Sequence, residues 1–337
     1  MKESQLETQS QPWIIHSLPV NALNFCAFDM IFLEDVFLGT EDKQESLGSS
    51  TNSSTSPSDR VSLSPVLFAV PNALNSGAID IFHLPSEQRV STIPADTSTN
   101  TGMVMAVRLL VSPSNGELCA ASAYEDGHVM VFVRRGQLKE QDILSSTGGN
   151  GAPWKWEKVY TSRPHTQPVL SIDVAPSNEY FLSSSADALL VKHPIPTPGA
   201  VVGYVEEFPL KTVNTKHSGQ QGLRIRSDGK IFATAGWDCR TRVYSCKTMK
   251  ELAVLKWHQD GCYAAAFADV SAESSLTMGA RAESKEEDGS KIDTQLTKKA
   301  GGFSLATVQH QRNQKAQMTH WLAAGSKDGK ISLWDIY

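Results

Sequence analysis

The apolar residues of this chain come in short bursts rather than at helical spacing. The bursts are rich in Val, Ile, Leu and Phe, and runs of Gly, Pro, Ser, Asn and Asp separate them. Short apolar runs alternating with turn residues are typical of many short β-strands. The pattern therefore predicts an all-β fold with little helix.

Two long polar stretches interrupt this pattern. Residues 40–60 are dominated by Ser, Thr, Asp and Glu, and Leu47 is their only large apolar residue. Residues 270–318 hold a charged run followed by a segment rich in Lys, Gln and Arg. Such compositions cannot bury enough apolar surface to fold. We predict disordered insertions at 40–60 and 270–318, a polar N-terminus at 1–11 and one folded body over 12–337.

One arrangement of strand, turn and strand recurs five times. An apolar strand leads to a turn residue, an alternating strand follows, and a ring-bearing residue lies six positions after the turn residue. Asp-Gly at such a position suits a tight turn between antiparallel strands. Equal spacing in successive copies predicts a repeat architecture. The five pairs are Ser76 and Phe82, Asp126 and Phe132, Asp187 and His193, Asp238 and Tyr244, and Asp328 and Trp334.

A histidine precedes three of these copies, and a short apolar strand follows each histidine. His165 lies 22 residues before Asp187, and His217 lies 21 residues before Asp238. His258 lies 70 residues before Asp328, but the insertion at 270–318 accounts for 49 of them.

The arrangement resembles the WD repeat of β-propellers, in which each repeat forms a four-stranded antiparallel blade. We therefore predict an all-β WD-repeat β-propeller with about five recognisable blades, near residues 13–84, 102–134, 158–194, 211–248 and 252–337. The resemblance implies that the histidine hydrogen-bonds the turn Asp, and that the aromatic residue of the third strand joins the same network. It assigns this structural network to His165, Asp187, His217, Asp238, Tyr244, His258, Asp328 and Trp334.

Three stretches make a narrower resemblance: residues 13–28, 217–238 and 322–335. Together they are similar to the fungal ASTRA-associated protein 1 family, whose animal relative is the small G-protein β-subunit-like protein. The family has seven blades, and residues 13–28 are internal in its members. We therefore expect this chain to lack the N-terminal repeats of the family.

The resemblance implies a nuclear, non-enzymatic scaffold subunit of the ASTRA complex, linked to chromatin remodelling and to maturation of phosphatidylinositol-3-kinase-related kinases. The partners that it implies are a large pseudokinase, the kinase-maturation co-chaperone and the RuvB-like ATPases. The alternative is a chromatin reader whose propeller binds a histone tail or another peptide.

Charge adds one feature to this picture. The chain has 36 acidic and 31 basic residues, a net charge of −5, which excludes a generally basic nucleic-acid coat. The segment 211–256 nevertheless holds ten basic and three acidic residues. In it, Arg224 and Arg226, and likewise Arg240 and Arg242, lie at period two and are expected to point outward. They predict a patch for an acidic partner, with direct nucleic-acid binding less favoured, and the alternative is a solvated strand face.

The sequence carries no motif that predicts catalysis. Gly-x-Ser-x-Gly, phosphate-loop and His-Glu-x-x-His patterns do not occur, and the five cysteines form no Cys-x-x-Cys pair. We therefore predict no catalytic, cofactor or metal site. No apolar run approaches the ~20 residues that span a bilayer, so we expect a soluble intracellular protein without membrane partners.

Overall fold

The structure is a computed structural model of the whole chain. It describes residues 14–22, 25–38, 64–147, 154–196, 203–269 and 319–336, together with the single residues 309 and 312. The predicted N-terminus at 1–11 and the predicted insertion at 40–60 lie outside the described residues. The predicted insertion at 270–318 also lies outside them, apart from residues 309 and 312.

Strands dominate the described residues and form sheets in chain order. The first sheet holds β1 (Asp29–Phe32), β2 (Val66–Pro71), β3 (Ile79–Leu84) and β4 (Gln88–Ile93). The second holds β5 (Val104–Val111), β6 (Glu117–Tyr124), β7 (Val129–Gln137) and β8 (Trp156–Ser162). The third holds β9 (Val169–Val174), β10 (Tyr180–Ser185), β11 (Leu189–Pro194) and β12 (Lys211–Asn214).

Two more sheets follow in the C-terminal part of the chain. The fourth holds β13 (Gln220–Ile225), β14 (Ile231–Gly236), β15 (Arg240–Ser245) and β16 (Glu251–Lys256). The fifth has three strands among the described residues, β17 (Cys262–Phe267), β18 (Trp321–Ser326) and β19 (Ile331–Asp335). Sequential strands pair antiparallel in the first sheet, as they do in the second, fourth and fifth. The predicted all-β fold of repeated sheets is confirmed.

The sheets are offset from the predicted blades by about one strand. The segments that open the predicted blades at 158, 211 and 252 belong to β8, β12 and β16, each the outer strand of the preceding sheet. These strands lack the strong apolar alternation of the turn-flanking strands, and in β12 and β16 much of the surface stays accessible. In β12, for example, three of four residues are exposed.

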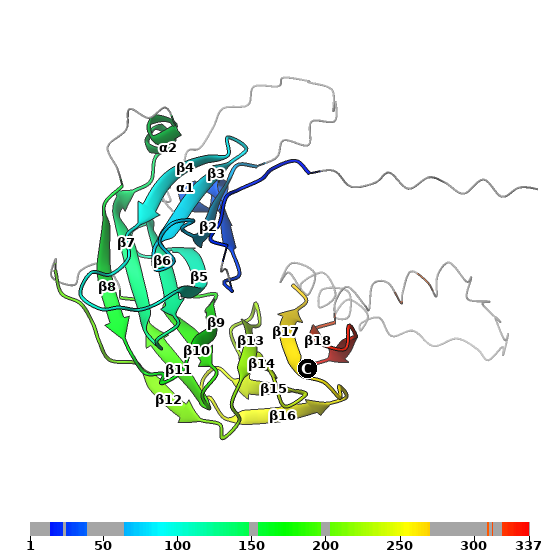
Figure 1. The fold of residues 1–337 in the computed structure, drawn as a ribbon. Coiled ribbons are helices and arrows are strands. Elements are labelled where there is room, and N and C mark those ends of the chain that lie inside the picture. Colours follow the sequence, from blue (N-terminus) through cyan, green and yellow to red (C-terminus); the bar gives the residue numbers. More distant parts are fainter. Residues whose placement is uncertain are drawn as a thin grey trace, which may run out of the picture. The chain divides into compact units, whose positions relative to one another are not determined.

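The chain divides into two compact units. Unit 1 comprises Met1–Ser183 and Val191–Thr212, and unit 2 comprises Ser184–Leu190 and Val213–Tyr337. In unit 1 the first two sheets lie side by side (Figure 1), and a cluster that includes Leu67, Ile79, Leu118 and Met130 fills the space between them. A second cluster, with Val131, Val169 and Phe181, joins the second and third sheets.

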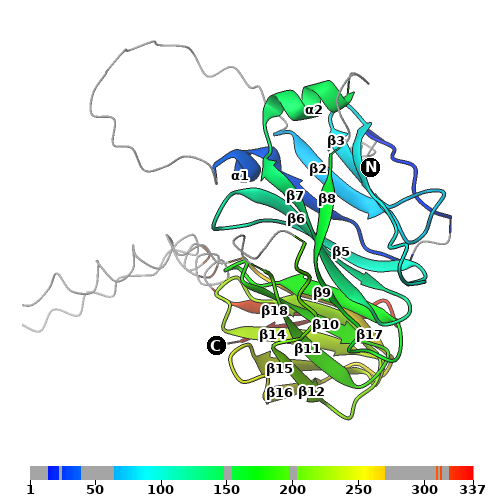
Figure 2. The same cartoon turned by 90° about the vertical axis from the view of Figure 1, so that its left-hand side faces the viewer.

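Two short helices occur in the described residues, in line with the prediction of an all-β fold with little helix. Helix α1 (Leu33–Leu38) directly follows β1 and buries Leu33 and Val36 in the core of unit 1. Helix α2 (Glu140–Thr147) contacts β4 at the end of unit 1 that is uppermost in Figure 2. In unit 2, Ala233, Val243 and Cys262 belong to a cluster that packs the fourth sheet against the fifth.

Candidate functional site

The predicted turn residues connect the second and third strands of their sheets. In three sheets the Oδ1 atom of the turn Asp accepts a hydrogen bond from the backbone N–H two residues later. These pairs are Asp126 with His128 (3.0 Å), Asp187 with Leu189 (2.8 Å) and Asp328 with Lys330 (3.0 Å). In these three sheets the carboxylate thus fixes the start of the third strand.

The fifth sheet brings its predicted residues together around one hydroxyl. His258 Nε2 lies 2.9 Å from Ser332 Oγ, and Trp334 Nε1 donates to the same oxygen at 2.9 Å. His258 Nδ1 lies 3.8 Å from Asp328 Oδ1, which exceeds hydrogen-bond length. Backbone donation from Lys330 is the main reason why the pKa of Asp328 is lowered. The predicted hydrogen bond from His258 to Asp328 is therefore not formed, and the hydroxyl that joins His258 to Trp334, Ser332, was not predicted.

In the fourth sheet the turn carboxylate binds an arginine instead of the predicted histidine. Arg242 Nη1 and Nη2 donate to the two oxygens of Asp238 at 3.1 and 2.5 Å, whereas His217 Nδ1 lies 4.0 Å away. Burial alone would raise the pKa of Asp238, but the Arg242 hydrogen bonds and nearby positive charges lower it overall. Tyr244 stacks on Phe232 with ring centroids 5.1 Å apart.

The third sheet carries a buried chain of hydrogen bonds. His165 Nε2 lies 2.7 Å from Ser183 Oγ, the same oxygen lies 2.8 Å from His193 Nε2, and His193 Nδ1 lies 2.8 Å from the Tyr160 hydroxyl. All four side chains are buried. Burial, together with the neighbouring His165, holds the pKa of His193 well below its ordinary value. The predicted Asp187 lies in the turn of this sheet, and the chain itself was not predicted.

The prediction that Arg224, Arg226, Arg240 and Arg242 all point outward is wrong for two of them. The Arg226 and Arg242 side chains are only 6% and 3% exposed, and each forms a two-pronged ion pair, with Asp228 and Asp238 respectively. Arg240 is 41% exposed, and Arg224 is half-buried. Period-two reasoning fails here because each of these two guanidinium groups is paired with a carboxylate close to it in the chain, and a paired charge can be buried.

A partly buried ion triad joins the strands that begin the first three sheets. Arg108 of β5 donates to Asp29 of β1 at 2.7 Å and lies 3.1 Å from a carboxylate oxygen of Asp173 in β9. The other Asp29 oxygen accepts the backbone N–H of Leu109 at 2.6 Å. Burial alone would lower the pKa of Arg108, but the charges of Asp173 and Asp29 raise it overall. Nothing in the repeat pattern had pointed to these residues.

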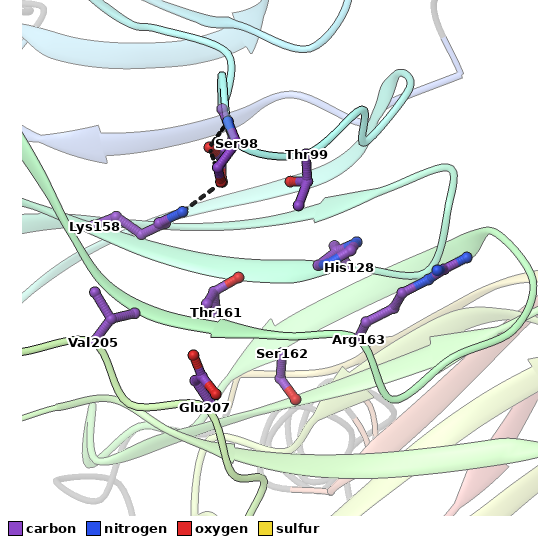
Figure 3. A pocket seen from close by; sticks show the side chains of 10 residues that line it. Ser98, Thr99, His128, Lys158, Thr161, Ser162, Arg163, Val205 and Glu207 are labelled. Atoms are coloured by element: carbon purple, nitrogen blue, oxygen red, sulfur yellow. Dashed lines mark hydrogen bonds and ion pairs between the residues drawn. The ribbon is translucent and has the colours of Figure 1, made fainter.

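A polar pocket of about 450 Å³ opens in unit 1 (Figure 3). Lys158 on its wall donates to Asp96 at 2.5 Å. Burial would raise the pKa of Asp96, but bonds from Lys158 and Ser98 hold it at about 2. Thr99, Thr161, Arg163 and Glu207 also line the pocket. Opposite charges and hydroxyls on one wall suit a polar protein segment better than an apolar small molecule.

The described residues hold neither a candidate metal-binding cluster nor a candidate membrane-spanning helix. No group of three or more His, Cys, Asp or Glu residues that could hold a metal ion occurs among the residues that the structure describes. No helix in this part of the chain is long and apolar enough to cross a membrane.

Comparison with known proteins places the chain among WD-repeat proteins. Residues 156–191 and 316–335 match the family described as WD domain, G-beta repeat. The chain is 60% identical to ASTRA-associated protein 1 of Aspergillus niger over 336 residues, which cover 97% of this chain and 72% of that protein. It is 59% identical over 344 residues to the protein of that name from Penicillium rubens, covering 100% of this chain and 74% of the relative. The predicted WD-repeat β-propeller class and the predicted resemblance are confirmed.

Proposed function

Because this chain belongs to the ASTRA-associated protein 1 family of WD-repeat proteins, we propose that it is a non-enzymatic scaffold subunit that associates with the ASTRA complex. The observation that carries the proposal is the 60% identity to a relative named for this association, over 97% of the chain. The hydrogen bonds of the histidines also support it, because His165, His193 and His258 each bind a serine hydroxyl and so hold strands of the sheets together.

The proposal extends to location and partners. The chain acts in the nucleus, in chromatin remodelling and in maturation of phosphatidylinositol-3-kinase-related kinases. Its partners are the large pseudokinase, the kinase-maturation co-chaperone and the RuvB-like ATPases. Rigid sheets with polar loops at their ends suit such a role, because they present fixed surfaces to several proteins at once.

Affinity purification of the tagged full chain from nuclear extract, followed by mass spectrometry, tests this proposal. We expect enrichment of all three partner classes over a control WD-repeat protein that carries the same tag. Recovery of the same proteins in equal amounts with the control would overturn the association. Fluorescence microscopy of the tagged chain tests the nuclear location, and exclusion from the nucleus would contradict it.

A further inference from the structure

The indole of Trp237 is exposed and yet held in one position. Trp237 lies in the turn between β14 and β15 and is 44% exposed. Its Nε1 donates to Gln221 Oε1 at 3.1 Å, and its backbone N–H donates to the Gly219 carbonyl at 3.0 Å. A Cβ atom on Gly219 would lie only 2.2–2.7 Å from ring carbons, so one face of the indole rests directly on the Gly219 backbone.

Three loops of unit 2 meet at this tryptophan. The first carries Gly219, the second is the turn that carries Trp237 itself, and the third carries Gly261. A Cβ atom on Gly261 would lie 3.3 Å from the Trp237 carbonyl oxygen and 3.5 Å from the hydroxyl of Tyr263, a residue that is 42% exposed. Cys239 Sγ also donates to the Gln259 carbonyl across two of these loops at 3.1 Å. Contacts among three loops, rather than within a single loop, therefore hold the aromatic surface in place.

Exposed cations surround this aromatic surface. Arg240 begins β15 and lies opposite Lys256 in the register of β15 and β16, and Lys216 lies on the loop that carries Gly219. The carboxylate of Asp238 in the same turn is 35% exposed, pairs with Arg242 and lies 3.9 Å from Arg240. Asp260 is the exposed acidic residue of the third loop. Positive charge therefore predominates at this edge of the fourth sheet.

We propose that this surface, the Trp237 rim (Trp237, Tyr263, Lys216, Arg240 and Lys256), docks an acidic peptide segment of a partner protein. The segment carries an apolar or aromatic side chain among its carboxylates. An indole already fixed in place loses little conformational entropy on binding, which is the property of an interface hot spot. The surrounding cations select carboxylates and speed the encounter. A protein segment is favoured over nucleic acid because the chain as a whole has a net charge of −5.

Fluorescence anisotropy with the purified full chain tests the rim. The probe is a fluorescein-labelled peptide of alternating Asp and Glu around a central Phe, and the comparison peptide has Lys in place of each acidic residue. We expect the acidic peptide to bind at least about tenfold more tightly. Trp237→Ala should weaken its binding by about tenfold. Asp260→Asn should tighten binding, because it removes a like charge.

A matched pair of variants separates the rim from net charge. Lys216→Glu/Lys256→Glu should weaken binding by about fivefold or more. Lys247→Glu/Lys250→Glu makes the same change in charge in the β15–β16 turn, at the opposite end of the strands from Trp237, and should leave affinity unchanged. Thermal unfolding of each variant shows whether it is folded. If Trp237→Ala does not fold, the variants at the exposed lysines still test the proposal.

Several results would overturn the proposal. These are equal weakening by the two lysine pairs, no binding of the acidic peptide, tighter binding of the Lys peptide, or preference for a single-stranded dT oligonucleotide. Tighter binding of the Lys peptide is the result expected of a histone-tail reader. The scaffold role gives this surface its biological meaning but is tested separately. A chain that recovers the ASTRA proteins and ignores the acidic peptide loses only this inference.

Discussion

At the scale of single residues, His193 shows how a different residue type at one repeat position changes the hydrogen bonds of its sheet. The corresponding positions of the other sheets hold Phe, Tyr or Trp, which fill space. His193 fills the same space, stacking on Phe181 at 4.6 Å, and also bridges Ser183 and Tyr160 through its two ring nitrogens. The imidazole must stay neutral to do so, because its surroundings are buried.

This neutral histidine predicts a loss of stability in acid. The unfolded chain protonates His193 near pH 6.5, whereas the folded chain does not because its pKa is lowered. The unfolded state therefore binds more protons below pH 6.5, and the free energy of unfolding falls. Between pH 7 and pH 5.5 this costs about 1 kcal/mol. Denaturant titrations at both pH values should show this loss in the wild type and a smaller loss in His193→Phe.

The comparison within each protein cancels any constant cost of the substitution. His193→Phe removes the imidazole that binds Tyr160 and one of the two imidazoles that bind Ser183, so its stability is expected to be lower at both pH values. Only the difference between the two pH values reports the titration of His193. Equal acid losses in the two proteins would show that another group controls the pH dependence.

The sequence predicted the turn residues well and the arginines poorly. Asp126, Asp187 and Asp328 lie in the turns that their spacing predicted, and there each accepts a local backbone hydrogen bond. Arg226 and Arg242 are buried although charge usually marks a surface, because each is paired with a carboxylate two or four residues away. Such pairs are visible in a sequence only when the fold shows which strand faces are covered.

At the scale of elements, the hydroxyl that hydrogen-bonds the repeat's histidine can come from either of two facing strands. In the third sheet the hydroxyl that binds the histidine is Ser183, four residues before the turn Asp. In the fifth sheet that position is Ala324, and the hydroxyl comes from Ser332, which lies directly opposite Ala324 in the register of β18 and β19. The bond is retained although the strand that supplies it has changed.

This exchange predicts a rescue. Ser332→Ala removes the common partner of His258 and Trp334, and should lower the free energy of unfolding by about 1–2 kcal/mol. Adding Ala324→Ser restores a hydroxyl from the facing strand and should recover about half of that loss. Thermal or denaturant unfolding measures both variants. Ala324→Ser alone is the control, and a double variant no more stable than Ser332→Ala would contradict the exchange.

The ion triad predicts a larger effect, because it links three strands. Arg108→Met removes the cation that Asp29 and Asp173 share, and these carboxylates are only 13% and 15% exposed. We expect a loss of about 2–4 kcal/mol in the free energy of unfolding. Adding Asp29→Asn and Asp173→Asn removes the stranded charges and should recover much of this loss in the same denaturant titration. No recovery would assign the loss to packing of the arginine side chain instead.

Elements were predictable where the repeat pattern is strong. The two strands that flank each turn were located from the fixed offset of six residues. The outer strands β8, β12 and β16 were assigned to the wrong blade, because a partly exposed edge strand carries a weak apolar pattern. Helix α2 was missed since its eight residues hold only two large apolar side chains.

At the scale of the whole molecule, three large apolar side chains of unit 1 form an exposed stripe in the part of the chain that the structure describes. Phe28, Met30 and Phe32 are 59%, 48% and 44% exposed, and they follow one another at period two along β1. The side chains between them point the other way, Asp29 to Arg108 and Ile31 to the core of unit 1. An exposed apolar stripe of this kind favours association with other apolar surfaces.

The stripe predicts that the purified chain self-associates as its concentration rises. Met30→Lys/Phe32→Lys should reduce this self-association in sedimentation velocity and leave the unfolding temperature nearly unchanged, because neither side chain is buried. Ile31→Lys is the matched control from the same strand. It places a charge against the core, so it should lower stability without relieving association. If Met30→Lys/Phe32→Lys self-associates as strongly as the wild type, the sticky surface lies elsewhere on the molecule.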